Sequence, residues 1–153
     1  MININIAKKS DLKEFAKLRF LAHKYSAKFD KDIIISADTQ QKLARLTEKE
    51  FEDPRITYLI VKDGQELVGI VILSLAKGID KSAFLGELFI KEKYRHKGIG
   101  KKLIEEIIRI VNKEGINSLR VTVSSSNKEA QNFYSNFGFH RKKRRYVLLE
   151  KRL

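Results

Sequence analysis

The chain opens on an alternation of apolar and polar residues, which predicts a β-strand over residues 2–6. From Ser10, a candidate N-cap, apolar residues recur every three or four positions and predict an amphipathic helix that ends at about Ala27. A weaker pattern with the same period predicts a second helix over Asp38–Phe51. The first third of the chain is therefore predicted to form one strand followed by two helices.

Segments rich in apolar and β-branched residues predict three further strands. Residues 56–61 and 67–75 lie on either side of Asp63-Gly64, a dipeptide that favours a tight turn, and so predict a hairpin. Residues 84–90 are nearly continuous in apolar residues, which is typical of an interior strand. The charged exception is Glu87, whose carboxylate is costly to bury unless it faces a cleft or a partner.

Helices and strands alternate in the C-terminal half. Residues 99–111 carry apolar residues on one helical face and charged residues on the other, and Gly115 is a suitable C-terminal stop. Residues 119–123 predict another strand. Ser126 and Glu129 have the spacing of a capping box, which predicts the start of a helix that ends at Gly138.

A last hairpin is predicted by Phe139 and Tyr146–Leu149. The predicted order is β-α-α-β-β-β-α-β-α-β plus a final strand, which gives an α/β fold with a mixed sheet and helices on both faces. At 153 residues the chain is long enough for one core, so we expect a single domain over residues 1–153.

The composition excludes several kinds of site. The chain has no cysteine, and this excludes disulfides, thiolate metal ligands and a cysteine nucleophile. Its start lacks the apolar core of a signal peptide, and its longest apolar stretch, Leu67–Ala76, is too short to cross a bilayer. These features predict a cytoplasmic protein without a membrane segment.

The chain is strongly basic, with a net charge of +13 from 32 Lys and Arg against 19 Asp and Glu. Such a field attracts polyanions such as nucleic acid, anionic membranes or a phosphorylated cofactor. The cluster Arg141–Arg145 is a candidate nucleic-acid patch. No aromatic residues are interleaved with it for base stacking, which favours a solvated turn instead.

A loop with two glycines joins the strand at 84–90 to the helix at 99–111. It reads Arg95-x-x-Gly98-x-Gly100, which has neither the Gly-x-Gly-x-x-Gly spacing of a dinucleotide fold nor the Gly-x4-Gly-Lys-Ser/Thr pattern of a P-loop. Glycines allow a tight turn and a close approach to a ligand, and a helix start offers unpaired N–H groups at the positive end of its dipole. The loop therefore predicts a pyrophosphate site; a solvated turn is the alternative for the loop taken alone.

This loop resembles the acyl-CoA signature of the GNAT superfamily of N-acetyltransferases. The segment from Asn127 to Phe139 reads Asn-x-x-Ala-x-x-x-Tyr-x-x-x-Gly-Phe and resembles the second signature of that superfamily, in the right order and spacing. The resemblance is specific over about Phe84–Leu153. It implies an acetyl-CoA-dependent N-acetyltransferase, an acyltransferase that acts on a primary amine of a small molecule or protein by direct attack in a ternary complex.

The resemblance also implies where acetyl-CoA lies. In that superfamily the strands before and after the glycine-loop helix, here 84–90 and 119–123, splay apart, and the pantetheine arm lies between them like an added strand. Backbone N–H groups of the loop hold the pyrophosphate, and one strand N–H polarises the thioester carbonyl. The implied cofactor-binding residues are Leu88, Phe89, Ile90, Arg95, His96, Lys97, Gly98, Ile99, Gly100, Lys101, Asn127 and Ala130.

Aminolysis of a thioester needs a base for the amine and an acid for the leaving sulfur, and it needs no metal. The resemblance places Tyr134 at the thiol as the acid; the alternative is a tyrosine that packs in the apolar stripe of its helix. Glu87 is the candidate base, and a salt-bridged or substrate-binding carboxylate is the alternative.

A second class of function stays open, namely a non-catalytic acyl-CoA sensor or a nucleic-acid-associated regulatory module. The acceptor stays open among small amines, peptide N-termini, lysines and aminoglycosides. A basic surface disfavours polyamines as free substrates, although an acidic pocket around Glu87 would override this locally. A homodimer is compatible with the resemblance.

Overall fold

The structure is a computed structural model that describes residues 1–76, 78, 81–142 and 148–152. Its centre is a five-stranded sheet in which the strands follow their order in the sequence. Neighbouring strands are antiparallel except for the last pair, which is parallel, so the predicted mixed sheet is confirmed. The strands are β1 (Ile2–Ile6), β2 (Ile56–Asp63), β3 (Glu66–Ala76), β4 (Ser82–Ile90) and β5 (Leu119–Val121).

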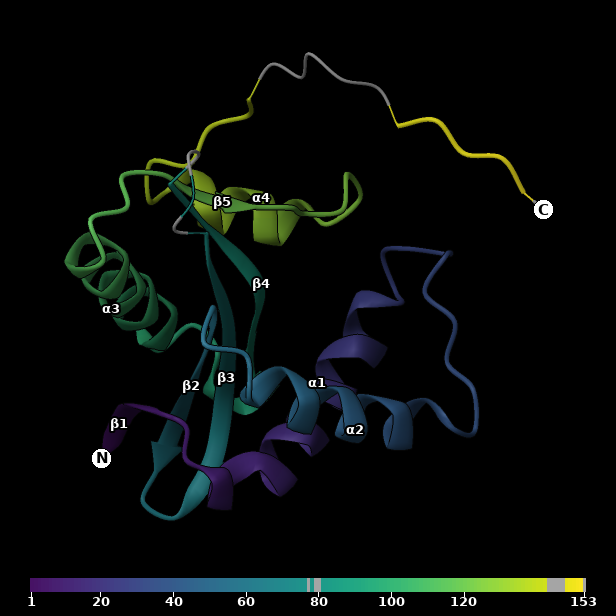
Figure 1. Cartoon of the computed structure of the whole chain (residues 1–153), viewed down its shortest axis with the longest axis horizontal. Coiled ribbons are helices and arrows are strands. Elements are labelled where there is room, and N and C mark those ends of the chain that lie inside the picture. Colours follow the sequence, from purple (N-terminus) through teal and green to yellow (C-terminus); the bar gives the residue numbers. More distant parts are fainter. Residues whose placement is uncertain (77, 79–80, 143–147, 153) are drawn as a thin grey trace.

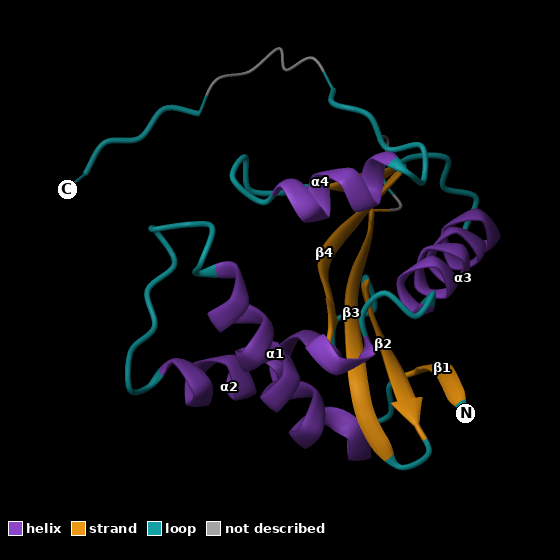
Figure 2. Ribbon diagram, turned by 180° about the vertical axis from the view of Figure 1, so that it is seen from behind, coloured by secondary structure: helices purple, strands orange, loops and turns teal. Residues whose placement is uncertain are grey.

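Helices lie on both sides of this sheet (Figures 1 and 2). The pair α1 and α2 covers one face, and α3 lies on the other, with α4 beside it at the β5 end of the sheet. Within the described residues no helix combines the length and the apolar character needed to cross a membrane. The helices are η1 (Lys9–Asp11), α1 (Leu12–Ser26), α2 (Thr39–Phe51), η2 (Glu92–Tyr94), α3 (Ile99–Lys113) and α4 (Lys128–Ser135), where η denotes a 3₁₀ turn.

Each face of the sheet has its own apolar core. On the α1 side, Phe15 stacks on Tyr58 of β2 with ring centroids 4.3 Å apart. On the other side, Leu103 and Ile107 of α3 are fully buried against β3 and β4. The apolar residues whose spacing predicts α1 and α3 are thus the residues that these helices bury against the sheet.

Local boundaries differ from the predictions for identifiable reasons. The turn η1 precedes α1, so the first helix begins at Leu12. The predicted N-cap Ser126 is replaced by Asn127, whose side chain accepts a hydrogen bond from the Ala130 N–H at 3.0 Å. The predicted hairpin after Asp63 is confirmed, with Gly64 at φ 58° in a two-residue turn.

The last hairpin is not confirmed where the chain can be followed. Residues 139–142 and 148–149 are in no strand, and 143–147 lie outside the described residues, as does most of the basic cluster Arg141–Arg145. Leu148 and Leu149 are 92% and 86% exposed. The apolar residues at 139 and 148–149 were therefore not sufficient evidence for a strand at these positions.

A β-bulge in β4 decides which way Glu87 faces. Ile72 of β3 pairs with Glu87, but the next residue of β3 pairs with Leu85, so Gly86 is an extra residue. Leu85 belongs to the α3-side core and Phe89 to the α1-side core, although residues four apart in a regular strand share a face. The bulge thus turns Glu87, which shares the face of Phe89, toward α1.

Candidate active site

The strands β4 and β5 part after a short run of pairing. They pair over Ala83–Leu85 of β4, and beyond Leu85 the edge of β4 has no neighbouring strand among the described residues. The backbone N–H of Lys91 donates to the Val68 carbonyl at 2.9 Å. In an antiparallel pair every second residue is hydrogen-bonded to the neighbouring strand, so this bond shows which residues of β4 are bonded to β3. By this alternation the backbones of Glu87 and Phe89 bond to β3, while those of Leu88 and Ile90 point into the gap. Of the three residues predicted to bind pantetheine, Leu88 therefore presents both backbone groups to the gap and Ile90 its N–H, since the Ile90 carbonyl accepts a hydrogen bond from Arg95.

The start of α3 presents a row of backbone N–H groups beside this gap. Gly98 is the N-cap at φ 78°, and the Lys102 N–H makes the first bond of the helix, to the Gly98 carbonyl at 3.2 Å. The N–H groups of residues 99–101 precede that bond and are free to receive an anion. His96 is also left-handed, at φ 58°, and its Nε2 lies 3.5 Å from Glu129 Oε1 of α4. The exposed side chains of Lys97 and Lys101 add positive charge.

Gly100 allows α3 to pack closely against α4. A Cβ atom at this position would lie 2.7 Å from Cε2 of Phe133 and 3.0 Å from its Cζ. The Phe133 ring is itself held between Tyr134 and Phe137, at centroid distances of 5.1 and 5.0 Å. The second glycine of the loop is thus explained by helix packing, a reason different from the close approach to a ligand that the sequence suggests.

We expect Gly100→Ala to lower the free energy of unfolding by about 1–3 kcal/mol, because the new methyl group must displace an aromatic ring that has little room to move. Chemical denaturation measures the change. The matched variant Gly100→Ala/Phe133→Leu opens space for the methyl group, and it is expected to recover part of the loss that Gly100→Ala causes when compared with Phe133→Leu alone. Equal losses in both backgrounds would contradict this packing explanation.

Arg95 does not extend freely into solvent. Its Nε donates to the Ile90 carbonyl at 2.8 Å, and its guanidinium lies 4.4 Å from the ring centroid of Tyr25 and 5.5 Å from that of Phe89. The side chain therefore links the end of β4 to α1 by a hydrogen bond and cation–π contacts. Arg95 was predicted to add positive charge at the pyrophosphate site. The guanidinium does lie at the loop, but its contacts are those of a residue that holds the loop in place.

The connection between α1 and α2 crosses to the loop between β5 and α4. The Phe29 carbonyl accepts hydrogen bonds from the hydroxyls of Ser124 and Ser126, at 2.9 and 2.8 Å. The ring of Phe29 contacts Tyr25, which in turn contacts Phe89. These contacts tie the α1–α2 side of the molecule to the far side of the gap, and sequence periodicity gave no sign of them.

Glu87 is a half-buried carboxyl without a hydrogen bond or an ion pair to any described residue. Burial raises its pKa to about 7, against the opposing charge of Arg19. No fully buried side-chain oxygen or nitrogen in the described part of the chain lacks a partner. The carboxyl oxygens of Glu87 therefore reach solvent, and near neutral pH the group can take up or release a proton.

Tyr134 lies on α4, near Glu87. Its ring packs edge-on against Phe133 and Phe139, and its hydroxyl has no partner among the described residues. Burial, together with the negative charge of Glu87, raises its pKa to about 12, so the two side chains are near enough to interact electrostatically. The phenol is held in its protonated form, as a proton or hydrogen-bond donor must be.

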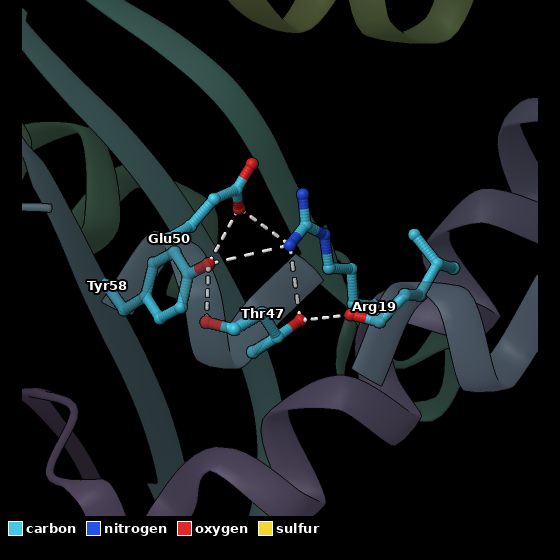
Figure 3. Close-up of polar contacts among 5 residues, drawn as sticks. Arg19, Thr47, Glu50 and Tyr58 are labelled. Carbon is cyan, nitrogen blue, oxygen red and sulfur yellow. Dashed lines mark hydrogen bonds and ion pairs between the residues drawn. The ribbon is translucent and has the colours of Figure 1, made fainter. Parts of the chain in front are cut away.

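A buried polar cluster that was not predicted from the sequence is formed by Arg19, Thr47, Glu50 and Tyr58 (Figure 3). Its Arg19 is near enough to Glu87 to act on that carboxyl electrostatically. Nη1 of Arg19 donates to Glu50 at 2.7 Å, to Thr47 at 3.2 Å and to the Tyr58 hydroxyl at 3.5 Å. The Tyr58 hydroxyl donates to Glu50 Oε2 at 2.7 Å, and the Thr47 hydroxyl to the Leu43 carbonyl at 2.7 Å. The cluster joins α1, α2 and β2. Arg19 lies on the apolar face of its helix in the sequence, and that displaced charge was the available signal.

Asn127 and Ala130 were predicted to contact the cofactor. The structure uses the Asn127 side chain and the Ala130 N–H to cap α4, at the far side of the gap from β4. Capping fixes the first turn of the helix that carries Tyr134. A contact of these residues with a cofactor stays a prediction.

Comparison with known proteins gives a consistent picture. A sequence profile described as Acetyltransferase (GNAT) family matches residues 19–139. N-alpha-acetyltransferase 30 of Xenopus laevis is 31% identical over 99 residues, which cover 62% of this chain and 36% of that protein. Spermidine N(1)-acetyltransferase of Thermoplasma acidophilum is 30% identical over 115 residues, 75% of this chain and 70% of that protein. Thialysine N-epsilon-acetyltransferase of Bos taurus is 29% identical over 70 residues, 46% and 41% of the two chains. The match thus spans about a third of the length of the first of these relatives.

Solved structures share the whole fold. An aminoglycoside N-acetyltransferase in complex with CoA superposes with a TM-score of 0.81 at 18% identity, over 100% of this chain and 96% of that one. A tetramutant of a Bacillus halodurans protein superposes with a TM-score of 0.79 at 22% identity, over 97% and 99% of the two chains. At these identities the likeness establishes the fold, including the sheet that carries the gap.

Proposed function

The chain belongs to the acetyltransferase (GNAT) family, and from this premise we propose that it transfers the acetyl group of acetyl-CoA to a primary amine, bound together with acetyl-CoA in the cleft between β4, β5 and α1. One observation carries the proposal. Two half-buried titratable groups that have no partners among the described residues, Glu87 and Tyr134, lie near each other, next to a strand edge and a helix start whose backbone groups are unpaired in the described chain. Buried polar groups normally find partners, so these are groups that a ligand completes.

In the proposed complex, acetyl-CoA supplies the activated acetyl group. The backbone N–H groups of residues 99–101 bind its pyrophosphate, and the backbone groups of Leu88 and the N–H of Ile90 bind its pantetheine arm. The Leu88 N–H is the donor best placed by the strand alternation to hydrogen-bond the thioester oxygen and to stabilise the negative charge that develops there.

The reacting protons go to the two side chains in turn. Glu87, with a pKa of about 7, accepts a proton from the ammonium form of the acceptor, and the free amine attacks the carbonyl carbon. As the C–N bond forms, the C–S bond breaks and the sulfur leaves as a thiolate. Tyr134 donates to this sulfur, first as a hydrogen bond and then as a proton. The attacking nitrogen loses its second proton to solvent to give the amide, the Tyr134 phenolate is reprotonated from solvent, and Glu87 later returns its proton to solvent. The proton on Glu87 removes the charge that helps to hold the pKa of Tyr134 high, so the first transfer makes the second easier.

The direct test is a thiol-release assay with acetyl-CoA and a panel of amines that includes amino acids, peptides, polyamines and aminoglycosides. We expect CoA release that depends on the amine and an acetylated product by mass spectrometry. If CoA binds and no amine in the panel is acetylated, the protein is better described as an acyl-CoA-binding module, and the enzymatic proposal is wrong.

A further inference from the structure

One edge of the Arg19 guanidinium, formed by Nε and Nη2, makes no hydrogen bond to a described residue; we call it the open edge. The residue is 9% exposed, and of its three guanidinium nitrogens only Nη1 bonds to a described residue. Since no fully buried nitrogen in the described part of the chain is without a partner, Nε and Nη2 must account for part of that small exposure. In Figure 3 the free terminal nitrogen of Arg19 and the free oxygen of Glu50 both point away from Thr47.

The open edge has the geometry that recognises a carboxylate. Nε and Nη2 of an arginine lie side by side in one plane and donate two parallel hydrogen bonds to the two oxygens of a carboxylate. Contacts of Nη1 with α2 and β2 hold the plane in place. A side chain that is fixed on one edge and open on the other is preorganised for a ligand, because no rotamer freedom is lost when the ligand binds.

Arg19 and Glu87 act on the same region of the cleft. The bulge at Gly86 turns Glu87 toward α1, the helix that carries Arg19, and the positive charge of Arg19 acts on the Glu87 carboxyl. An acceptor whose amine reaches Glu87 therefore has its neighbouring substituent close to Arg19. A carboxylate on that substituent would complete the open edge.

We propose that the acceptor is an amine that bears a carboxylate, as an amino acid does, and that the Nε–Nη2 edge of Arg19 binds this carboxylate while Glu87 receives the amine. The inference rests on the proposed acetyl transfer and adds the substrate class. Arg19 is then a specificity-determining residue in the acceptor subsite.

The charges in and around the cleft agree with this class. Glu50 pairs with Arg19 at 2.7 Å and balances its charge, so the carboxylate is recognised by paired hydrogen bonds and not by excess charge at the subsite. The net charge of +13 attracts an anionic group from solution and repels a polycation. A polyamine would also place a second ammonium group near the guanidinium. The acceptor named for the Thermoplasma acidophilum relative, spermidine, therefore fits this cleft less well than an amino acid does.

Matched acceptors test the inference on the unmodified protein. Each set consists of an amino acid, its amide and the amine that remains when the carboxylate is absent, so that the reacting amine is the same. We expect kcat/KM for the carboxylate to exceed that for the amide by about 10- to 100-fold, mainly through KM, since two charge-assisted hydrogen bonds are lost in the amide. If the amide or the carboxylate-free amine is acetylated as efficiently as the amino acid, the inference is wrong although the proposed function stands. If no member of any set is acetylated, the proposed function fails first.

Variants assign the preference to Arg19. Arg19→Lys keeps a positive charge beside Glu50 but has no planar edge, so we expect the ratio of carboxylate to amide kcat/KM to fall by at least about tenfold. The ratio is measured within one variant and does not depend on how much of the protein is folded. Arg55→Lys is the matched control, because Arg55 is an exposed arginine that pairs with Asp53, and its ratio should equal that of the parent. If the ratio of carboxylate to amide kcat/KM is unchanged in Arg19→Lys, a group other than Arg19 binds the carboxylate and the inference is wrong.

Discussion

Glu87→Gln is expected to lower kcat/KM for amine acetylation by about 10²- to 10⁴-fold at neutral pH, because glutamine keeps the shape of the side chain but cannot accept the proton of the amine. In the parent protein kcat/KM should rise with pH through an apparent pKa of about 7, the value at which this buried carboxyl loses its proton. The variant should lack this limb of the profile. The pH dependence of kcat/KM, measured for both proteins with the same amine, tests the assignment.

The same substitution should stabilise the fold at alkaline pH. The pKa of Glu87 is raised from 4.5 to about 7 in the folded state, so between these values the folded protein binds more protons than the unfolded chain. The free energy of unfolding contributed by this group therefore falls as pH rises across that window and stays low above it. We expect Glu87→Gln to be more stable than the parent by about 1–3 kcal/mol above about pH 8, and to differ little at about pH 4.

Glu105→Gln is the control for both measurements. Glu105 is an exposed carboxylate on α3 that lies 3.9 Å from Lys101, outside the cleft. Its replacement should leave the pH profile and the stability nearly unchanged. An unaltered profile in Glu87→Gln would remove this carboxyl from the reaction and support the alternative of a substrate-binding or structural group.

Tyr134→Phe is expected to lower kcat by about 10²-fold or more, because phenylalanine fills the same space between Phe133 and Phe139 but has no proton for the leaving sulfur. The KM for acetyl-CoA should change little, since the hydroxyl acts on the sulfur as the C–S bond breaks. The hydroxyl has no partner among the described residues, so its loss should not lower the stability. Steady-state kinetics and thermal denaturation together separate these effects.

Tyr94→Phe is the matched control for this variant. The Tyr94 hydroxyl bonds to Glu66 at 3.0 Å on the surface, and removing it should leave kcat near the parent value. A Tyr134→Phe protein with the parent kcat would show that Tyr134 is a packing residue of the apolar stripe, the alternative that the sequence leaves open.

The elements that build the cleft could be predicted from the sequence because each buries a regular pattern. The spacing of apolar residues in α1, α3 and β4 matches the faces that these elements bury. Gly98 marks the turn into α3 because it adopts a left-handed conformation, and Gly100 is required by packing against Phe133. Glu87 and Tyr134 could be proposed from the sequence because one is a charge in an apolar strand and the other completes a motif, and their catalytic roles stay predictions.

Features that depend on contacts between distant segments could not be predicted. The bulge at Gly86 shows no pattern of its own, and without it the sequence cannot tell which face Glu87 occupies. The place of Arg19 on the apolar face of its helix is visible in the sequence, but its partners on α2 and β2 are not. The predicted strand at Phe139 had apolar residues in its favour, but no sheet neighbour receives them in the described chain.

The most direct test of the account is a crystal structure of the protein grown with CoA. We expect the pyrophosphate within hydrogen-bond distance of the N–H groups of residues 99–101, the pantetheine arm along Leu88 and Ile90, and the sulfur facing Tyr134. A CoA molecule bound elsewhere, with the gap between β4 and β5 empty, would contradict the account.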